Sequence, residues 1–310
     1  MIAGTATNAT AAAEEEKTYL VGICQLVQHE ALDAATQGFQ DVLTEKLGDK
    51  VTFDSQNAAG DTGTATQIVT SLVQENCDLI LANATPALQS AQAATNQIPV
   101  LGTSITDYGQ ALGLEDFSGV VGGNISGTSD LPPLDQQAAM FAELLPDAMN
   151  IGIVYCSAEA NSKYQADEVQ KYLEEAGDTV TVYTFSDSND IASVMEQACS
   201  NSDALYIPTD NTAASCTETI NNVASNYSMP IIGGEEGIMN GCGIAALSIS
   251  YYELGRTTGE MAVRILTGES NVSEMPIEYY QNPVKKYNPT ICERLGITVP
   301  EGYEAGAVEE

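Results

Sequence analysis

Residues 78–86 have the sequence Asp-Leu-Ile-Leu-Ala-Asn-Ala-Thr-Pro, in which an apolar run ends at a turn and a helical pattern follows. We interpret this stretch as a buried strand, a sharp turn and the start of a helix. Thr85 is a good helix N-cap and Pro86 a good first helical residue. The N–H groups of that first turn would then point beyond the carboxyl end of the strand, where they favour an anion.

A second stretch, residues 203–211, repeats this pattern as Asp-Ala-Leu-Tyr-Ile-Pro-Thr-Asp-Asn. Acidic and amide side chains stand here at the positions where the first stretch has a hydroxyl. Because opposite charges attract, the second turn suits a cation, whereas the first suits an anion.

Strand and helix signals alternate along most of the chain, which is typical of βαβ units on a parallel sheet. We predict strands at 19–24, 51–55, 78–82 and 98–104, and again at 151–156, 179–185, 203–207 and 229–234. Helices are predicted between them, at 30–47, 64–76, 162–176 and 191–199. Corresponding stretches recur at a nearly constant separation, which indicates an internal duplication of an α/β half.

Three further segments belong to neither half alone: a strand at 245–250, a helix at 254–267 and a strand at 275–280. We therefore predict an α/β fold of two similar doubly wound parallel-sheet lobes joined by a multi-crossing hinge. The first lobe would hold residues 17–127 and about 250–279, and the second about 128–249 and 280–310. The cleft between two such lobes is the usual place for a ligand.

Composition excludes several classes of protein. Apolar residues make up 44% and charged residues 17% of the chain, which favours a globular fold. A net charge of −33 repels phosphate backbones and so excludes nucleic acid as a partner. Residues 1–16 have neither the basic nor the apolar region of a signal peptide, and we predict a flexible tether. Such a tether is typical of a chain that begins after a cleaved leader or beside a lipid anchor, with an ordinary disordered terminus as the alternative.

Few residues are available for catalysis or metal binding. The seven cysteines form no C-x-x-C pair, so mainly buried free thiols are expected, with a bridge from Cys199 to Cys216 left open. The single histidine, His29, excludes a multi-histidine metal site, and the familiar hydrolase and nucleotide-binding motifs are absent. We predict no metal, no cofactor and no enzymatic activity.

Several short motifs, taken in this order and spacing, resemble the extracytoplasmic solute-binding proteins of ABC transporters with the type I periplasmic-binding fold. The resemblance is to the branch associated with tryptophan and tyrosine uptake, and it covers almost all of residues 18–300. The motifs are Gln25 with residues 29–33, residues 38–39, 59–61, 84–86, 106–107 and 123–130, then 159–162, 208–211, 251–255 with Gly259, and 295–300. Two places depart from the family pattern: Glu30 follows His29 where proline is common, and residues 233–237 are unusually acidic.

The resemblance implies a non-catalytic, monomeric receptor outside the cytoplasmic membrane, held there by a lipid anchor. It would close on an amino acid, with an aromatic one favoured, and present it to an ABC transporter permease. The alternatives are a binding protein for another small solute such as a purine nucleoside, a ligand-sensing regulatory domain of the same fold, and an enzyme on a two-domain α/β scaffold.

An amino acid needs donors for its carboxylate and an acceptor for its ammonium group. Thr85, Ser104 and the amides at the helix start are predicted to bind the carboxylate, and Asp210, supported by Asn211, the ammonium. Thr85 and Asp210 have helix capping as an alternative role, and capping is favoured for Ser162. The predicted ligand-binding residues are Gln25, Ala84, Thr85, Ser104, Asp130, Glu159, Ser162, Asp210, Asn211 and Glu235. Tyr155 and Tyr206 are predicted to be core residues.

Overall fold

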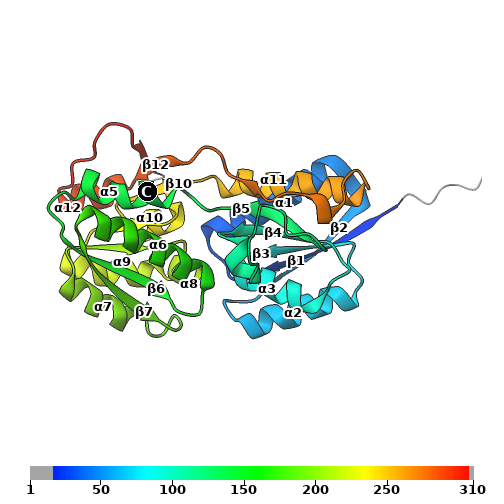
Figure 1. Ribbon diagram of the computed structural model, residues 1–310, viewed down its shortest axis with the longest axis horizontal. Coiled ribbons are helices and arrows are strands. Elements are labelled where there is room, and N and C mark those ends of the chain that lie inside the picture. Colours follow the sequence, from blue (N-terminus) through cyan, green and yellow to red (C-terminus); the bar gives the residue numbers. More distant parts are fainter. Residues whose placement is uncertain (1–16, 307–310) are drawn as a thin grey trace, which may run out of the picture.

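The computed structural model describes residues 17–306 and shows two α/β lobes side by side (Figure 1). The predicted tether at residues 1–16 lies outside the described residues. Among residues 17–306, no helix is long and apolar enough to cross a membrane.

The first lobe is built on a sheet of six strands that are all parallel. The strands are β1 (Tyr19–Gln25), β2 (Val51–Asn57), β3 (Leu79–Asn83), β4 (Val100–Ile105), β5 (Ile125–Ser129) and β11 (Glu278–Tyr279), in the order β11-β5-β4-β3-β1-β2. Its helices are α1 (Glu30–Leu47), α2 (Thr62–Gln74), α3 (Thr85–Ala94), α4 (Tyr108–Leu112) and α11 (Tyr251–Leu266), with short 3-10 turns at Gly48–Lys50 and Val272–Glu274. All five residues of β3 are buried, as its apolar sequence predicts for a central parallel strand.

The second lobe has a seven-stranded sheet in which only the β10–β12 pairing is antiparallel. The strands are β6 (Asn150–Cys156), β7 (Thr179–Phe185), β8 (Ala204–Ile207), β9 (Ile231–Gly233), β10 (Ala245–Ser248), β12 (Val284–Tyr287) and β13 (Glu304–Ala305), in the order β13-β12-β10-β9-β8-β6-β7. The helices are α5 (Leu134–Leu144), α6 (Ala160–Ala176), α7 (Ile191–Asn201), α8 (Asn211–Ala214), α9 (Thr217–Tyr227), α10 (Glu236–Cys242) and α12 (Pro289–Leu295).

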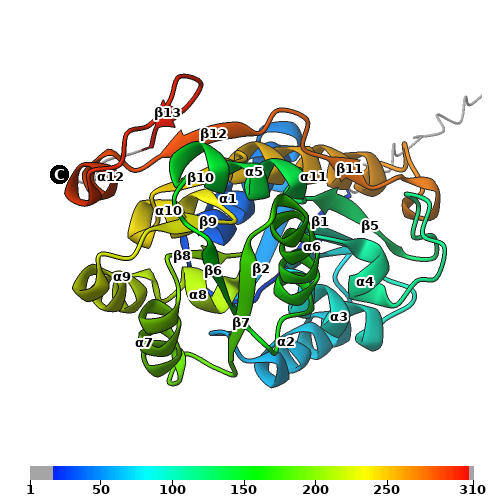
Figure 2. The same cartoon turned by 60° about the vertical axis from the view of Figure 1, so that its left-hand side comes forward.

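The two sheets repeat the same strand order, β2-β1-β3-β4-β5 in the first and β7-β6-β8-β9-β10 in the second. This repetition confirms the predicted fold class of two similar doubly wound lobes. The chain passes between the lobes three times: after β5, after β10 and after β11 (Figure 2). The connecting residues are 130–133, 249–250 and 280–283.

Helices α1 and α11 lie against each other at backbone distance on the first lobe. A Cβ atom placed on Gly255 would stand 2.0 Å from the carbonyl oxygen of Ala35, and one on Gly38 would stand 2.1 Å from that of Tyr252. Only glycine permits this approach. Phe39 of α1 and Met261 of α11 share one buried apolar cluster with the first strand of the sheet.

Local differences from the sequence predictions lie mostly at element ends. The predicted strand at 275–280 is reduced to the two residues of β11, which follow a 3-10 turn. Helix α2 begins at Thr62, two residues earlier than predicted, because Asp61 caps it by accepting from the N–H of Thr64 at 2.6 Å. All seven cysteines are free thiols, and six of them are buried, as predicted. Tyr155 and Tyr206 are buried core residues, as predicted.

Candidate ligand-binding cleft

The predicted ligand-binding residues lie at the ends of strands or at the starts of the helices that follow them. Gln25 and Ser104 end or nearly end β1 and β4, Ala84 and Thr85 follow β3, Asp130 follows β5, Glu159 and Ser162 follow β6, Asp210 and Asn211 follow β8, and Glu235 follows β9. All ten are buried.

Polar contacts join the two lobes along this edge, and we call this junction between the lobes the seam. The Nε2 atom of His29 lies 3.3 Å from Oδ1 of Asn211, and Nε2 of Gln165 donates to Oγ1 of Thr106 at 3.2 Å. The lobes are therefore closed on one another.

Helix α3 starts without a side-chain cap. The helix begins at Thr85, so Ala84 occupies the N-cap position and has no side chain to accept a hydrogen bond. The predictions of Thr85 as N-cap and Pro86 as first helical residue are thus wrong by one position. Ala84 has a φ of +88°, and nearby Ser104 has a φ of +56°. A positive φ in two non-glycine residues at one sheet edge is a strained arrangement that often marks a functional site.

Asp130 lies in the first segment that crosses between the lobes, and its side chain is 3% exposed. Its Oδ2 atom accepts from the hydroxyl of Tyr251 at 2.9 Å. Its Oδ1 atom is buried and, within residues 17–306, has no hydrogen-bond partner, and the same holds for Oγ of Ser104. Burial raises the pKa of Asp130 to about 6, although the hydrogen bond from Tyr251 lowers it in part. Buried polar atoms without a partner are rare, which makes these two candidates for contact with a ligand.

In the second lobe, the carboxylate of Glu159 is surrounded by donors. It accepts from the backbone N–H and side-chain amide of Asn211 at 3.0 and 2.6 Å, and from the N–H and hydroxyl of Thr212 at 2.9 and 2.8 Å. Glu159 thus connects the start of α6 to the start of α8.

Asp210 is also fully engaged. Its Oδ1 atom accepts from the N–H of Ala213 at 2.8 Å and caps α8, and its Oδ2 atom accepts from the N–H of Cys156 at 2.7 Å. Burial and the nearby charge of Glu159 raise its pKa. This geometry favours the capping role, and the ammonium role of Asp210 stays a prediction.

The remaining predicted residues hold loops in place. Gln25 donates to Oδ1 of Asp33 at 2.6 Å and accepts from the hydroxyl of Thr36 at 2.6 Å, which fixes the loop from β1 to α1. Ser162 is the third residue of α6 and its predicted capping role is wrong, because the N-cap position is that of Glu159. Glu235 caps α10 through the N–H groups of Gly237 and Ile238, at 2.7 and 2.5 Å, and burial raises its pKa to about 7.

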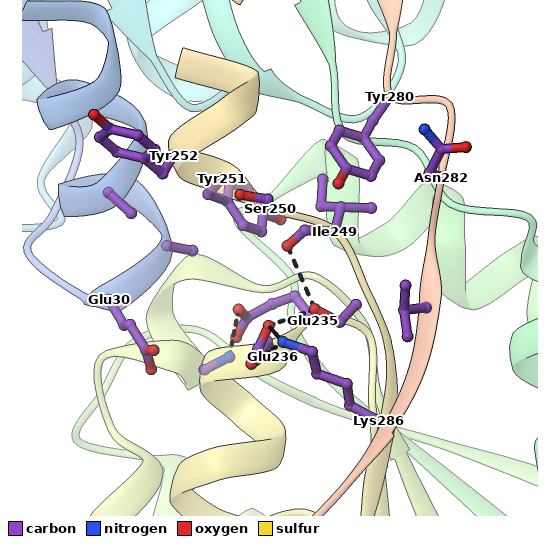
Figure 3. A pocket seen from close by; sticks show the side chains of 15 residues that line it. Glu30, Glu235, Glu236, Ile249, Ser250, Tyr251, Tyr252, Tyr280, Asn282 and Lys286 are labelled. Atoms are coloured by element: carbon purple, nitrogen blue, oxygen red, sulfur yellow. Dashed lines mark hydrogen bonds and ion pairs between the residues drawn. The ribbon is translucent and has the colours of Figure 1, made fainter. Parts of the chain in front are cut away.

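Glu235 also borders a pocket of about 270 Å³ beside the hinge (Figure 3). In this view Tyr280 and Asn282 come from the third crossing segment, and Lys286 forms an ion pair with Glu236 at 2.7 Å. A different pocket, of about 240 Å³, opens between the lobes and is lined from both sides, by Leu26 and Pro86 and by Glu159 and Asn211 among others. This second pocket is lined by Pro86 at the start of α3 and by two predicted ligand residues, Glu159 and Asn211, but by neither Asp130 nor Ser104.

Sequence reasoning gave no site role to three polar residues of the closed seam: Thr106, Gln165 and Tyr251. Thr106 and Tyr251 belong to motifs of the family resemblance, which was the available signal. Gln165 lies inside a helix, where nothing in the local sequence distinguishes an interlobe contact from an ordinary surface position.

The fold and the closed cleft define a two-lobed binding protein. The chain belongs to the family described as ABC transporter substrate binding protein, whose sequence profile matches residues 20–309, and this confirms the predicted family. Membership makes it a substrate-binding protein of an ABC transporter, which is a binding role.

Individual relatives agree with this assignment. The chain is 36% identical over 275 residues to a tyrosine-binding protein of Clostridioides difficile, covering 88% of this chain and 79% of that one. It is similar to an ABC domain from Streptococcus pneumonia crystallised in complex with L-Trp, with a TM-score of 0.89, 33% identity and coverage of 94% of this chain and 100% of the other. It is also similar to the ligand-free, open structure of a substrate binding protein with adhesive properties from Clostridium difficile, with a TM-score of 0.70, 34% identity and the same coverage.

These two structural comparisons differ in TM-score although identity and coverage are alike. The fit is better to the complex with L-Trp than to the ligand-free, open structure. This difference in TM-score and the hydrogen bonds between the lobes both indicate that the lobes of this structure are closed.

Proposed function

We propose that this protein binds an aromatic L-amino acid in the closed cleft and delivers it to the permease of an ABC importer. The names of a tyrosine-binding relative and of an L-Trp complex support tyrosine and tryptophan as the first candidates. In this proposal the protein works as a monomer outside the cytoplasmic membrane, held by a lipid anchor.

One observation carries the proposal of an amino acid: Oδ1 of Asp130 and Oγ of Ser104 are buried in the closed protein and lack partners among residues 17–306. A carboxylate oxygen in this state calls for a positively charged donor, which the ammonium group of an amino acid supplies. The Ser104 hydroxyl and the uncapped start of α3 offer donors to the ligand's carboxylate.

The charge of the buried seam supports the same assignment. Asp130, Glu159, Asp210 and Glu235 are each at most 4% exposed, and the buried residues of the described chain include no lysine or arginine. Among these four carboxylates only Asp130 keeps an oxygen without a partner in the described chain, and a ligand that brings its own cation suits it better than a neutral solute such as a nucleoside.

The test is calorimetry on protein stripped of any bound ligand by unfolding and refolding, with the twenty L-amino acids and a set of purine nucleosides. We expect binding of L-tyrosine, L-tryptophan or L-phenylalanine. Tyramine, which lacks the carboxylate, and 3-(4-hydroxyphenyl)propionate, which lacks the ammonium group, should each bind at least tenfold more weakly than tyrosine, because each loses one charge-assisted set of hydrogen bonds. Binding of a nucleoside with no response to any amino acid would overturn the proposal.

A further inference from the structure

Gln165 joins the two lobes through a side chain that is fully buried. It lies on α6 of the second lobe, and its Nε2 atom donates to Oγ1 of Thr106, which follows β4 in the first lobe, at 3.2 Å. Its Oε1 atom accepts from the N–H of Thr209 in its own lobe, at 3.2 Å. Each end of the amide thus has a protein partner, one in each lobe.

In the first lobe, hydrogen bonds connect the segment of Thr106, the partner of Gln165, to the backbone at Asp130. The backbone oxygen of Thr106 accepts from the hydroxyl of Ser129 at 2.9 Å, and the N–H of Asp130 donates to the oxygen of Ile105 at 3.1 Å. The segment that presents Thr106 to Gln165 is therefore the same segment that fixes the backbone of Asp130.

In the second lobe, Thr209, the partner of Gln165, is hydrogen-bonded to Asn161. The backbone oxygen of Thr209 accepts from Nδ2 of Asn161 at 2.9 Å, and Oδ1 of Asn161 is another buried atom without a partner in the described chain. The two partners of Gln165 are thus each connected by backbone hydrogen bonds to a residue with an unpartnered acceptor, Asp130 and Asn161.

We propose that Gln165 is a positioning residue, which holds the lobes closed over the ligand and keeps Thr106 and Asp130 in register without touching the ligand. The inference rests on the proposed function for its ligand and on the geometry of the seam for its mechanism. Opening the lobes separates Gln165 from Thr106, so this bond contributes to the closed state alone. Its loss should raise the dissociation rate, because ligand release requires opening.

The chain offers a matched control in Gln137, a second fully buried glutamine of the second lobe. Its Nε2 atom donates to the oxygen of Gly234 at 3.0 Å, and its Oε1 atom accepts from the hydroxyl of Tyr206 at 2.5 Å. Both partners belong to the same lobe as Gln137. Gly234 also accepts from the hydroxyl of Thr209 at 3.3 Å, but no bond of Gln137 crosses to the first lobe. We therefore expect removal of its amide to lower folding stability and to leave the contact between Gln165 and Thr106 in place.

The experiment compares Gln165→Met with Gln137→Met by stopped-flow fluorescence, using L-tyrosine and L-tryptophan as probes. Methionine keeps the length of the side chain and removes both hydrogen bonds. For Gln165→Met we expect the dissociation rate to rise about three- to tenfold, the worth of one ordinary hydrogen bond. The association rate should change less than twofold, and the preference between the two probes should stay the same. Gln137→Met should lower the melting temperature and leave the dissociation rate unchanged.

Equal dissociation rates in Gln165→Met and wild type, or the same increase in Gln137→Met, would overturn the inference. A double-mutant cycle with Thr106→Val adds a second check, because the two changes remove the same bond and should not add in their effect on the dissociation rate. Thr106→Ser, which keeps the hydroxyl, should restore the wild-type rate, and full additivity in the cycle would contradict a direct contact.

The failure of the proposed function would show separately, as an absence of binding of either probe to wild-type protein. The inference about Gln165 is then decided in ligand-free protein by small-angle X-ray scattering. We expect a larger radius of gyration for Gln165→Met than for wild type, with Gln137→Met equal to wild type. Equal radii for all three proteins would overturn it.

Discussion

The starts of α3 and α8 occupy equivalent places in the two lobes and are built in opposite ways. In the first lobe, α3 begins after Ala84 with no side-chain cap. In the second lobe, α8 begins after Asp210, which caps it, while Glu159 accepts from the next two N–H groups. The helix start of the duplicated unit thus has no side-chain hydrogen bond to its N–H groups in the first lobe. In the second lobe, side chains of the same lobe accept from these N–H groups.

This difference separates acidic residues that organise the protein from an acidic residue that can serve a ligand. The carboxylates of Glu159, Asp210 and Glu235 are saturated by donors of their own lobe. Asp130 alone among the four keeps an oxygen atom without a partner in the described chain. Burial and a negative charge are therefore a poor guide to a ligand contact until hydrogen bonds are counted.

The largest expected effect comes from Asp130→Asn, which tests the open side of the comparison. The change removes the charge that pairs with the ligand's ammonium group and keeps the shape of the side chain. We expect the affinity for L-tyrosine, measured by calorimetry, to fall about 10- to 100-fold, the worth of about 1.5–3 kcal/mol for a charge-assisted hydrogen bond. Unaltered affinity would remove Asp130 from the site and break the comparison.

The raised pKa of Asp130, about 6, makes a second prediction. Below this pH the carboxyl group is neutral and no longer attracts an ammonium group, whereas the ligand's own charges do not change between pH 5 and 7.5. Affinity should therefore fall about tenfold from pH 7.5 to pH 5.

Stability of the ligand-free protein should move the other way and increase as the pH falls from 6 toward 4, because the folded state binds the proton more tightly than the unfolded chain. A pH profile identical in wild type and Asp130→Asn would contradict the assignment.

A smaller effect, on stability, is expected from Asp210→Ala, which tests the closed side of the comparison. Loss of this cap and of the bond from the Cys156 N–H should lower the free energy of unfolding by about 2 kcal/mol in urea denaturation, with affinity changed less than threefold. Asp61→Ala serves as a control, since Asp61 caps α2 through Thr64 in the other lobe. Loss of binding in Asp210→Ala alone would support the ammonium role predicted for Asp210 and reverse the roles of the two lobes.

The sequence predicts the fold well because periodicity and duplication report on burial. The apolar runs of β3 and β8 and the repeated pattern in the two halves indicate parallel strands in equivalent places, and the structure has them there. The same reasoning places polar residues at strand ends, since parallel strands end at a common edge.

The hydrogen-bond partners at that edge are harder to predict. Whether Asp210 faces a ligand or a backbone N–H depends on the turn geometry, and an Asp before a helix is compatible with both. The one-residue shift at Thr85 arises from the positive φ of Ala84, a conformation that no alanine signals in sequence. Gln165 contacts a residue of the opposite lobe, so only the closed arrangement reveals its partner.

The close contact of α1 with α11 makes the order of synthesis matter for folding. Phe39 and Leu43 of α1 are buried against Met261 and Ala262, which the ribosome adds more than two hundred residues later. The first lobe therefore stays incomplete, with an exposed apolar face, while the whole second lobe up to β10 is made. The first lobe can therefore be completed only after the second lobe has been synthesised, and its apolar face is open to unwanted contacts until then.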